Sequence, residues 1–418
     1  MRVALDTLGC KLNQAETEIL AGELTAAGFT IVYGREAADI YVLNTCSVTA
    51  EADRKARQLL RAAKRRNPKT FVVAVGCYGQ WNREALLKVA GVDMVLGSTD
   101  KFSLPQLLVE RHPKEATFLV SSKSKALRSR SFVKIQDGCD AFCAYCIVPY
   151  LRTVKNCLPV DEIISRINKR VEEGYKEVVL TGTEIGNYQD SGVELIGLIE
   201  RILDETNIER LRLSSLQPQH IDSRLLALWQ NERLCRHFHI SLQSGSDGVL
   251  SRMKRRYNIA TYRWVLTEIR HQLPDAAVTT DVIVGFPAET EEEFKQSYAF
   301  CQQMAFSRIH VFPYSARPAT AAAKIPNQVN PQVKKERAAK MLKLADTAAL
   351  AFRESYLGKQ AVVLWERETA GYWSGYTSNY IKVYVKSAKN LVNTITKVTL
   401  KDIGRDEVRG ISSTSPAP

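Results

Sequence analysis

The sequence has few cysteines for its length, nine in 418 residues, and so lacks the density of a disulfide-stapled scaffold. It also lacks an apolar run that approaches bilayer length, and Met1–Asp6 is typical of a strand and not of a signal peptide. Within the domains we see no internal repeat, and no tract of low complexity. We therefore expect a cytoplasmic protein with no membrane association, in which reduced thiols can serve as metal ligands.

The composition is that of a globular protein, with 45% hydrophobic and 25% charged residues. A chain of 418 residues predicts two to three domains. The net charge of +13 favours a polyanionic partner such as nucleic acid, because lysine and arginine neutralise phosphates without reading sequence. A generally basic surface would give the same charge.

The first hundred residues alternate between strand-like and helix-like segments. Amphipathic helical stretches are expected at about 14–27, 49–65 and 82–90. The expected strands are Val3–Asp6, Asp39–Leu43, Phe71–Val75 and Asp93–Leu96. This order predicts an N-terminal α/β domain over 1–118, with a parallel sheet covered by helices.

A second alternating series follows a basic linker, which we place at 119–130. After the sixth strand, about 330–356 reads as a long charged helix. The six expected strands are Phe132–Ile135, Glu177–Leu180, Arg210–Leu213, His237–Ile240, Val278–Val284 and Arg308–Phe312. Six βα units predict a partial, open version of the (β/α)8 barrel, a TIM-like (β/α)6 barrel over 131–356.

The last segment, 357–418, changes character. Alternating strands are expected at Gln360–Trp365, Ile381–Val385 and Thr394–Leu400, with Gly371, Gly375 and Gly404 as breaks. This pattern predicts a small antiparallel β-barrel.

Three cysteines, Cys139, Cys143 and Cys146, follow the first strand of the second series with C-x3-C-x2-C spacing. Such a loop can place three thiolates on a 4Fe–4S cube and leave the fourth iron open. A ferredoxin or a structural zinc site is the alternative, but each normally needs a fourth ligand, and none lies nearby.

Three other cysteines, Cys10, Cys46 and Cys77, each follow a strand of the first series. The carboxyl ends of parallel strands meet at one edge of the sheet, so these thiols should become neighbours. A lone cysteine is more often a small buried hydrophobic residue. Three at equivalent strand ends, two of them preceded by glycine, predict a second three-thiolate cluster, whereas Cys157, Cys235 and Cys301 are expected to be packing residues.

Polar and glycine-rich residues follow the other strands of the second series. Active sites of barrels are built at these carboxyl ends. The segments are Thr181–Glu184, Ser214–Pro218, Ser241–Gly245, Gly285–Pro287 and Pro313–Ser315.

These residues resemble the radical S-adenosylmethionine enzymes, whose cluster loop has the C-x3-C-x2-C spacing. The resemblance implies that the open iron chelates S-adenosylmethionine, that an electron from the cluster cleaves it, and that the protein orients and shields the resulting radical. It also implies that Glu184 holds the methionine ammonium and that the backbone at Gly285 approaches adenine. Gln243 and Ser244 are looser candidates for cofactor or substrate contact.

Read as a whole, the chain is similar to the methylthiotransferases of that superfamily, which join a three-cysteine domain, a radical barrel and a small RNA-binding barrel, the TRAM domain. The resemblance rests on Gly9–Asn13, Asn44–Cys46, Gly76–Cys77, Asp137–Tyr150, Leu242–Asp247 and Gly375–Tyr380. It implies two 4Fe–4S clusters, a tRNA anticodon stem-loop as partner and a reductant such as flavodoxin or ferredoxin. Aromatic and basic residues of the last segment are expected to contact RNA, namely Trp373, Tyr376, Tyr380 and Lys382.

Within that family, Gly9–Asn13 followed by Glu16 and Thr17 is similar to the branch that adds a methylthio group to C2 of N6-threonylcarbamoyladenosine 37 of tRNA. The same chemistry on isopentenyladenosine 37 or on a ribosomal-protein aspartate stays open, as does a non-enzymatic iron–sulfur RNA-binding sensor. The chain departs from the family at Thr153–Leu158, where arginines are missing, and at Gln217, where glutamate is frequent.

Overall fold

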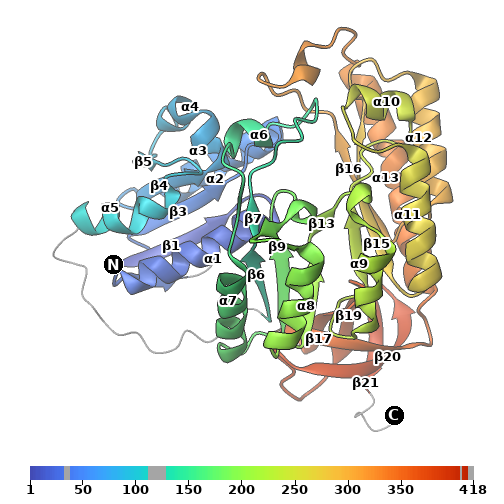
Figure 1. Cartoon of the computed structure of the whole chain (residues 1–418). Helices are drawn as coiled ribbons and strands as arrows, with labels where there is room; N and C mark the ends of the chain where they lie inside the picture. The colour runs from blue at the N-terminus through green and yellow to red at the C-terminus, as the bar shows by residue number, and fades with distance from the viewer. Residues whose placement is uncertain (33–37, 112–128, 405–406, 413–418) are drawn as a thin grey trace.

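The structure is a computed structural model that describes residues 1–32, 38–111, 129–404 and 407–412, so most of the predicted linker 119–130 lies outside the described residues. Figure 1 shows an α/β domain beside a partial barrel, with a smaller β-barrel below it. The predicted fold class is confirmed. The boundaries at 118, 130 and 356 remain predictions.

The N-terminal domain is a five-stranded parallel sheet in the order β2-β1-β3-β4-β5. Buried side chains of α1 and α5 pack on one face of the sheet, and those of α2 and α4 pack on the other. The strands are Arg2–Thr7, Thr30–Val32, Ile40–Thr45, Phe71–Gly76 and Met94–Val95, and the helices α1 to α5 are Lys11–Ala26, Ala50–Arg66, Cys77–Trp81, Arg83–Leu87 and Leu104–Arg111. Sequence analysis missed β2, which has only three residues.

Local sequence explains where α2 begins and ends. The Thr49 side chain caps the helix by accepting a hydrogen bond from the Ala52 N–H. Acidic residues occupy its first turn and Lys64, Arg65 and Arg66 its last turn, which matches the helix dipole.

The central domain contains the six predicted strands, now β6, β9, β12, β14, β15 and β16, in sequence order around an open barrel. A short strand, β13 (Ser215–Leu216), joins β14, and the Leu211–Leu234 bridge joins the region of β12 to the segment before β14. The six strands are Arg130–Lys134, Glu177–Thr181, Arg210–Leu213, His237–Ile240, Ala277–Val284 and Arg308–Pro313. The helices α6 to α13 are Val148–Leu151, Val160–Glu172, Leu195–Glu205, Ser223–Ala227, Asp247–Arg252, Ile259–Gln272, Glu291–Gln303 and Pro331–Glu354.

The two faces of these strands differ. Alternate residues such as Val178, Leu211, Phe238 and Val282 belong to the large hydrophobic core shared with the covering helices. Because side chains alternate along a strand, the residues between them point to the inside of the barrel.

The C-terminal domain is a closed barrel in the order β17-β18-β19-β21-β20. Its pairs are antiparallel except β19 with β21, which is parallel. Its strands β17 to β21 are Gln360–Thr369, Tyr372–Thr377, Lys382–Lys386, Ile395–Ile403 and Val408–Ser412.

The expected break at Gly375 was wrong, because this residue lies inside β18. A Cβ there would meet the Leu364 carbonyl oxygen at 2.3 Å, so glycine allows close strand approach.

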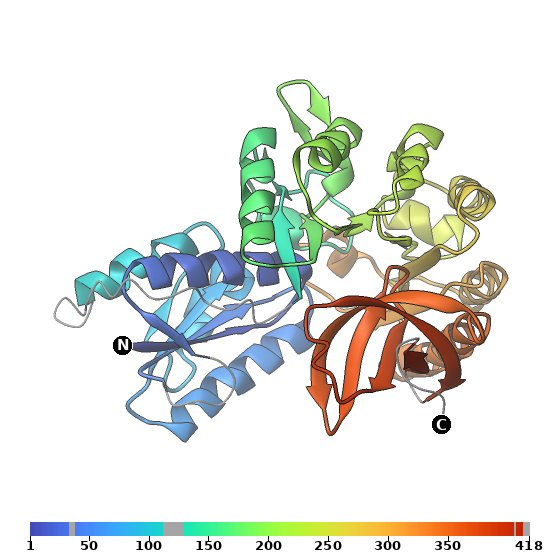
Figure 2. The same ribbon diagram turned by 90° about the horizontal axis from the view of Figure 1, so that it is seen from below.

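The small barrel lies against the amino-terminal ends of the central strands, as the view from below shows (Figure 2). The Arg212 guanidinium donates to the Ser378 carbonyl oxygen at 2.7 Å, and Arg210 donates to that of Tyr376 at 3.0 Å. The carboxyl ends of the central strands are therefore left free at the opposite end.

Candidate active site

The first three cysteines gather at one edge of the N-terminal sheet. Cys46 and Cys77 directly follow the neighbouring strands β3 and β4, and Cys10 lies three residues after β1. Cys46 and Cys77 are buried, whereas Cys10 is exposed. All nine cysteines of the chain are free thiols.

Glycine is required beside two of these thiols. Gly9 has φ +125°, and a Cβ there would lie 2.8 Å from the Cys46 Cβ. Gly76 has φ +94°, and a Cβ there would lie 2.3 Å from the Asn44 side-chain oxygen. Glycine adopts such φ values without steric penalty, so the cysteine segments can approach closely.

The second three cysteines lie at the carboxyl end of the central barrel. The Cys139 thiol contacts Glu184 Oε2 at 3.4 Å, and Arg255 Nη1 donates to the Cys143 sulfur at 3.1 Å. The Cys146 N–H donates to the Cys143 carbonyl oxygen at 2.9 Å, which closes the loop on itself. The three thiols thus share one loop, and all three are half-buried.

The segments that carry the two groups of thiols pack against each other. Cys77 packs in one apolar cluster with Ile147 and Leu151, and Ile147 directly follows Cys146. Helix α3, which begins at Cys77, packs against α6, which follows the second cysteine loop. The first cluster site therefore adjoins the mouth of the barrel that carries the second.

A buried ionic network fixes this arrangement. The Arg152 guanidinium donates to Glu16 at 2.8 and 2.9 Å and to Asp137 at 2.8 Å. Lys134 binds the same two carboxylates, and Lys101 also pairs with Glu16. Burial alone would raise the pKa of Glu16, but the Arg152 hydrogen bonds and the nearby cations hold that pKa at about 2.

Asn13 extends this network to the first cysteine. Its side-chain oxygen accepts from Arg152 Nη2 at 3.2 Å and from the Cys10 thiol at 3.7 Å. Sequence analysis missed the roles of Asn13, Glu16 and Arg152, although Asn13 and Glu16 stand in the motifs that it quoted.

Three polar side chains surround the second cysteine loop. The Gln217 amide donates to Glu184 Oε1 at 2.9 Å, while its oxygen accepts from Arg255 Nη2 at 3.1 Å. Gln217 therefore joins a carboxylate to a guanidinium, which requires one donor and one acceptor. An amide satisfies both roles, so the departure from glutamate at this position has a physical reason.

The looser cofactor candidates are placed near the same end of the barrel. Gln243 has φ +64°, and its backbone pairs with Asp281 and Ile283 of β15. Ser244 is buried. The Gly285 N–H already donates to Glu289 at 2.7 Å, so contact with a cofactor would use other atoms there. The cofactor roles of Glu184, Gln243, Ser244 and Gly285 stay predictions.

The thiols are suited to metal and not to free reactivity. Burial raises the pKa of Cys46 and Cys139 to about 12 and that of Cys146 to about 11. These three thiols therefore stay protonated until a metal displaces the proton. Three free thiols at each site form the donor set that iron–sulfur clusters bind.

The inside of the central barrel is polar, a feature that sequence analysis did not single out. His239 contacts Asp281 Oδ2 through Nε2 at 3.1 Å and Thr279 through Nδ1 at 2.9 Å. His310 joins them, with its ring centroid 5.9 Å from that of His239. Barrel interiors are usually packed with branched apolar side chains, so this polar interior suggests a function.

The residues predicted to bind RNA in the last domain are mostly occupied by protein contacts. Trp373 is in the hydrophobic core of the small barrel. Tyr380 has ring contacts with Arg212 and His237, which lie inside the central barrel. Tyr376 lies 4.8 Å from the Arg130 guanidinium, and the Lys382 ammonium lies over Tyr384. Their RNA contacts stay predictions, and for the tyrosines the structure shows a role in joining the two barrels.

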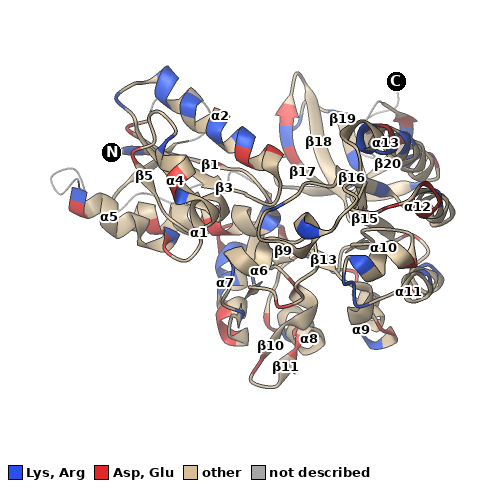
Figure 3. Cartoon of the chain, turned by 90° about the horizontal axis from the view of Figure 1, so that it is seen from above, with Lys and Arg blue, Asp and Glu red and all other residues tan. Residues whose placement is uncertain are grey.

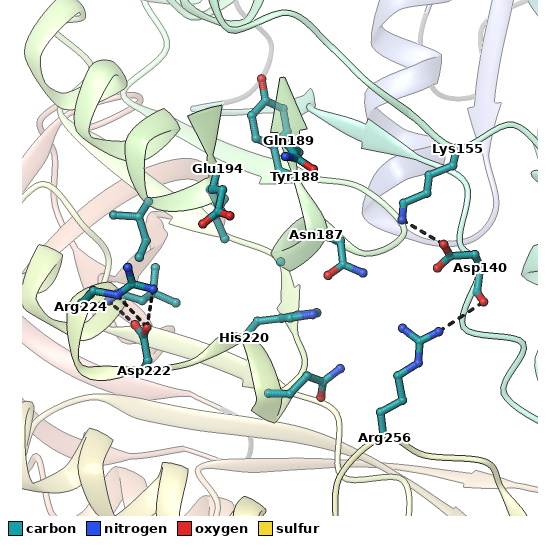
Figure 4. A pocket seen from close by; sticks show the side chains of 15 residues that line it. Asp140, Lys155, Asn187, Tyr188, Gln189, Glu194, His220, Asp222, Arg224 and Arg256 are labelled. Atoms are coloured by element: carbon teal, nitrogen blue, oxygen red, sulfur yellow. Dashed lines mark hydrogen bonds and ion pairs between the residues drawn. The ribbon is translucent and has the colours of Figure 1, made fainter. Parts of the chain in front are cut away.

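A pocket of about 420 Å³ opens beside the second cysteine loop (Figure 4). Lys155 pairs with the Asp140 carboxylate at 3.0 Å, and Arg256 contacts the Asp140 carbonyl oxygen at 3.5 Å. None of the six clustered thiols is among the residues that line this pocket.

The remaining cysteines behave as packing residues. Cys301 and Cys235 are buried, and Cys157 packs at the margin of the central core. No helix among the described residues combines the length and apolarity needed to cross a bilayer.

Comparison with known proteins assigns the chain. Residues 2–97 match the family described as Uncharacterized protein family UPF0004, and residues 133–301 match the Radical SAM superfamily. A threonylcarbamoyladenosine tRNA methylthiotransferase of Aquifex aeolicus is 38% identical over 400 residues, which cover 92% of this chain and 96% of that protein. A tRNA-2-methylthio-N(6)-dimethylallyladenosine synthase of Endomicrobium trichonymphae is 31% identical, covering 96% of this chain and 97% of that protein. The chain belongs to the methylthiotransferase family.

As a methylthiotransferase, the chain uses S-adenosylmethionine and [4Fe–4S] clusters. A solved structure supports the fold alone. The radical S-adenosylmethionine methyltransferase TsrM of Kitasatospora setae, with a tryptophan substrate and an S-adenosylmethionine analogue bound, aligns with a TM-score of 0.56 at 15% identity, covering 77% of this chain and 75% of that one.

Proposed function

We propose that this methylthiotransferase adds a methylthio group to C2 of N6-threonylcarbamoyladenosine 37 in tRNA. The observation that carries the proposal is the packing of Cys77 against Ile147 and Leu151, which brings the segments of the two three-thiol sites together at the mouth of one barrel. A single cluster would suffice for radical chemistry, whereas a second adjoining one supplies a place for sulfur. The substrate is suggested by the names of relatives at 33–38% identity over most of the chain.

Each group of thiols has its own part in the proposal. Cys139, Cys143 and Cys146 hold the cluster that binds S-adenosylmethionine, and Cys10, Cys46 and Cys77 hold the auxiliary cluster. When bound, the first supplies the radical that activates the nucleoside, and the second carries the sulfur that becomes the methylthio group.

The protein groups around the loop orient and shield the cofactor. Glu184 is buried and contacts the Cys139 thiol, which supports its assignment as the acceptor for the methionine ammonium. Gln217 and Arg255 fix that carboxylate and the Cys143 sulfur relative to each other. Gln243, Ser244 and the backbone at Gly285 complete the proposed binding surface.

The partner is the anticodon stem-loop of tRNA, which the family and the net charge of +13 both favour. Helix α2 carries exposed basic residues along its length, visible as blue bands in Figure 3, and its Ala50 N–H is held by Ser315 at 3.1 Å near the cluster sites. Its exposed cations are Arg54, Lys55, Arg61, Arg65 and Arg66. Phosphates of RNA bind such a surface without base specificity. A cytoplasmic location and a reductant such as flavodoxin or ferredoxin complete the proposal.

We divide the chain accordingly. Residues 1–118 hold the auxiliary cluster, 131–356 form the radical domain, and 357–418 form the RNA-binding barrel of the TRAM type. The main hydrophobic clusters of the N-terminal sheet, the central barrel and the small barrel are separate, which supports this division.

The proposal is tested in a strain that lacks the gene, by mass spectrometry of its tRNA nucleosides. The methylthio form of threonylcarbamoyladenosine should be absent from that strain and restored by the intact gene. Loss of the methylthio form of isopentenyladenosine, or of a ribosomal-protein aspartate modification, would instead favour those substrates.

Single substitutions separate the two cluster sites in purified protein. Cys46→Ala should abolish methylthiolation yet retain reductive cleavage of S-adenosylmethionine, whereas Cys139→Ala should abolish both. Cys157→Ala is the matched control, because Cys157 lies outside both sites, and it should keep both activities. Methylthiolation by Cys46→Ala protein would refute the auxiliary site.

A further inference from the structure

One cation beside the cluster sites has no partner. Lys11 is the first residue of α1 and directly follows Cys10, and α1 packs against β6 and β9 at the open side of the central barrel. Its side chain is half-buried. Within the described part of the chain, Lys11 makes neither a hydrogen bond nor an ion pair, so its ammonium is available for an anion.

The surroundings of Lys11 are the inside of the barrel. Burial and the charges of Arg212 and Arg130 lower the pKa of Lys11 to about 8, while those of Glu177 and Asp281 raise it. These four charged residues lie on the inner faces of four different strands, β12, β6, β9 and β15. Because α1 packs against β6 and β9, its amino-terminal end with Lys11 borders the inside of the barrel that bears the other cluster.

The carboxylates around Lys11 already have closer partners. Glu177 pairs with Arg212 at 2.7 Å and with Arg210 at 2.9 Å. Asp281 accepts from His239 Nε2, and Arg130 pairs with Glu366. Four cationic side chains thus face three carboxylates, namely Lys11, Arg130, Arg210 and Arg212 against Glu177, Asp281 and Glu366. Glu177, Asp281 and Glu366 are each paired with an arginine or a histidine, so none of these carboxylates is left for Lys11.

This interior is open to a ligand at the level of His239 and Asp281. The Asp281 side chain is 26% exposed and that of His239 11%, although both lie in the middle of inner strands. A group that entered here from the carboxyl end would meet imidazole, carboxylate and ammonium groups and little apolar surface.

We propose that Lys11 binds the carboxylate of the threonyl group on N6 of the substrate adenosine, with His239 and His310 beside the polar remainder of that group. This inference rests on the proposed function, in which C2 of the same adenine must lie between the two cluster sites. A single ammonium matches a single carboxylate, and the bound anion gives Lys11 the partner that the described residues do not supply. An isopentenyl group would leave these polar groups unpaired, which penalises the wrong substrate strongly.

The test compares two anticodon stem-loops that differ by one charge. One carries N6-threonylcarbamoyladenosine at position 37, and the other carries its methyl ester. Their affinities for the reconstituted holoenzyme are measured anaerobically by fluorescence anisotropy, without reductant, so that no turnover occurs. The proteins are the unsubstituted enzyme, Lys11→Gln, Lys11→Arg and the control Lys343→Gln, in which an exposed lysine of α13 is replaced. Iron content and the visible spectrum verify that each variant carries its clusters.

The enzyme should bind the acid roughly tenfold to a hundredfold more tightly than the ester, the range expected for a charged hydrogen-bonded pair. Lys11→Gln should bind both about equally, Lys11→Arg should keep most of the preference, and Lys343→Gln should keep all of it. If the unsubstituted enzyme binds the acid and the ester stem-loops with the same affinity, the inference is wrong. This comparison uses the unsubstituted enzyme only, so it does not depend on the folding of any variant.

Other outcomes identify a different anion. A Lys11→Gln variant that loses affinity for acid and ester equally would place Lys11 on an RNA phosphate and overturn the inference. If the Lys11→Gln variant needs more S-adenosylmethionine for cleavage in the absence of RNA, Lys11 binds the methionine carboxylate. That result would also overturn the inference. Failure of the enzyme to methylthiolate the acid stem-loop, with the binding preference intact, would refute the proposed reaction and leave the carboxylate site standing.

Discussion

At the scale of single residues, Arg152 shows how a cluster motif can serve an interface. It follows the second cysteine loop, yet its guanidinium binds Glu16 and Asn13 of α1 as well as Asp137 of its own domain. Five fixed donors let one arginine hold three side chains at once, which lysine cannot do. The distance between the two cluster sites therefore depends on a few charged groups.

Replacing Glu16 by glutamine should weaken this link. The change leaves Arg152 and Lys134 with Asp137 as their remaining carboxylate partner and leaves the buried Lys101 with none, and an unpaired buried charge costs about 3–5 kcal/mol. We expect a lower thermal midpoint and fewer methylthiolated products per S-adenosylmethionine cleaved. Calorimetry and product ratios measure these effects.

Glu23→Gln on the exposed side of the same helix is the control and should change neither quantity. An unchanged product ratio in Glu16→Gln protein would show that the network stabilises the fold without positioning the clusters.

At the scale of elements, α2 combines two roles. Its buried residues Ala56, Leu60 and Ala63 pack on the sheet, while its opposite side is basic and exposed. Its first turn is tied to the central domain, because Arg317 pairs with Asp53 at 2.8 Å. The basic side of α2 thus lies at a fixed position relative to the cluster sites.

The double substitution Arg61→Glu with Arg65→Glu should reduce tRNA affinity about tenfold or more at moderate salt. It should also lower the slope of log affinity against log salt by about 2, because two phosphate contacts are lost. Binding isotherms at several salt concentrations measure both effects.

Lys340→Glu with Lys343→Glu on α13 changes the net charge equally at exposed positions elsewhere. If both double variants lose affinity equally, general electrostatics and not α2 would account for the effect.

At the scale of the whole molecule, the small barrel closes the amino-terminal end of the central one. Glu177, Arg210 and Arg212 form a buried ionic group whose arginines donate to carbonyl oxygens of the small barrel. Burial alone would raise the pKa of Glu177, but Arg212 and Arg210 hold that pKa at about 2. This group therefore couples the stability of two domains to pH.

The sign of that coupling follows from the lowered pKa. A glutamate in the unfolded chain has a pKa of about 4.3. The interactions of Glu177 therefore stabilise the fold above that pH, and this contribution is lost as the pH falls towards 2. The contribution at neutral pH is roughly 3 kcal/mol. Urea unfolding of the reduced, cluster-free chain at pH 7 and pH 3 should show this loss, and Glu177→Gln should be destabilised at pH 7 by about 3–5 kcal/mol.

The Glu177→Gln variant should also lose less free energy of unfolding than the unsubstituted chain between pH 7 and pH 3. Glu209→Gln, which removes an exposed carboxylate near the same strand, is the control and should behave as the unsubstituted chain. Equal pH dependence in all three proteins would contradict a role for Glu177.

Much of the fold was predictable because its signals are local. The alternation of strands and helices, the cysteine spacing and the position of thiols at strand ends are properties of short segments, and they predicted both α/β domains and both groups of thiols. Strand β2 was missed because three residues carry too little pattern. Strand β18 was missed because a glycine such as Gly375 is typical of a break, and its close approach to Leu364 of β17 is not visible in the sequence.

The sequence by itself determined the family, the donor sets and the order of the domains, since each depends on residue types at fixed spacing. Only the tertiary structure decided which charged groups meet. Arg152 reaches Glu16 across 136 positions, Lys11 borders a barrel built from later strands, and Tyr380 lies against Arg212 and not on a free surface. Such pairings arise from packing between domains, and no local pattern encodes them.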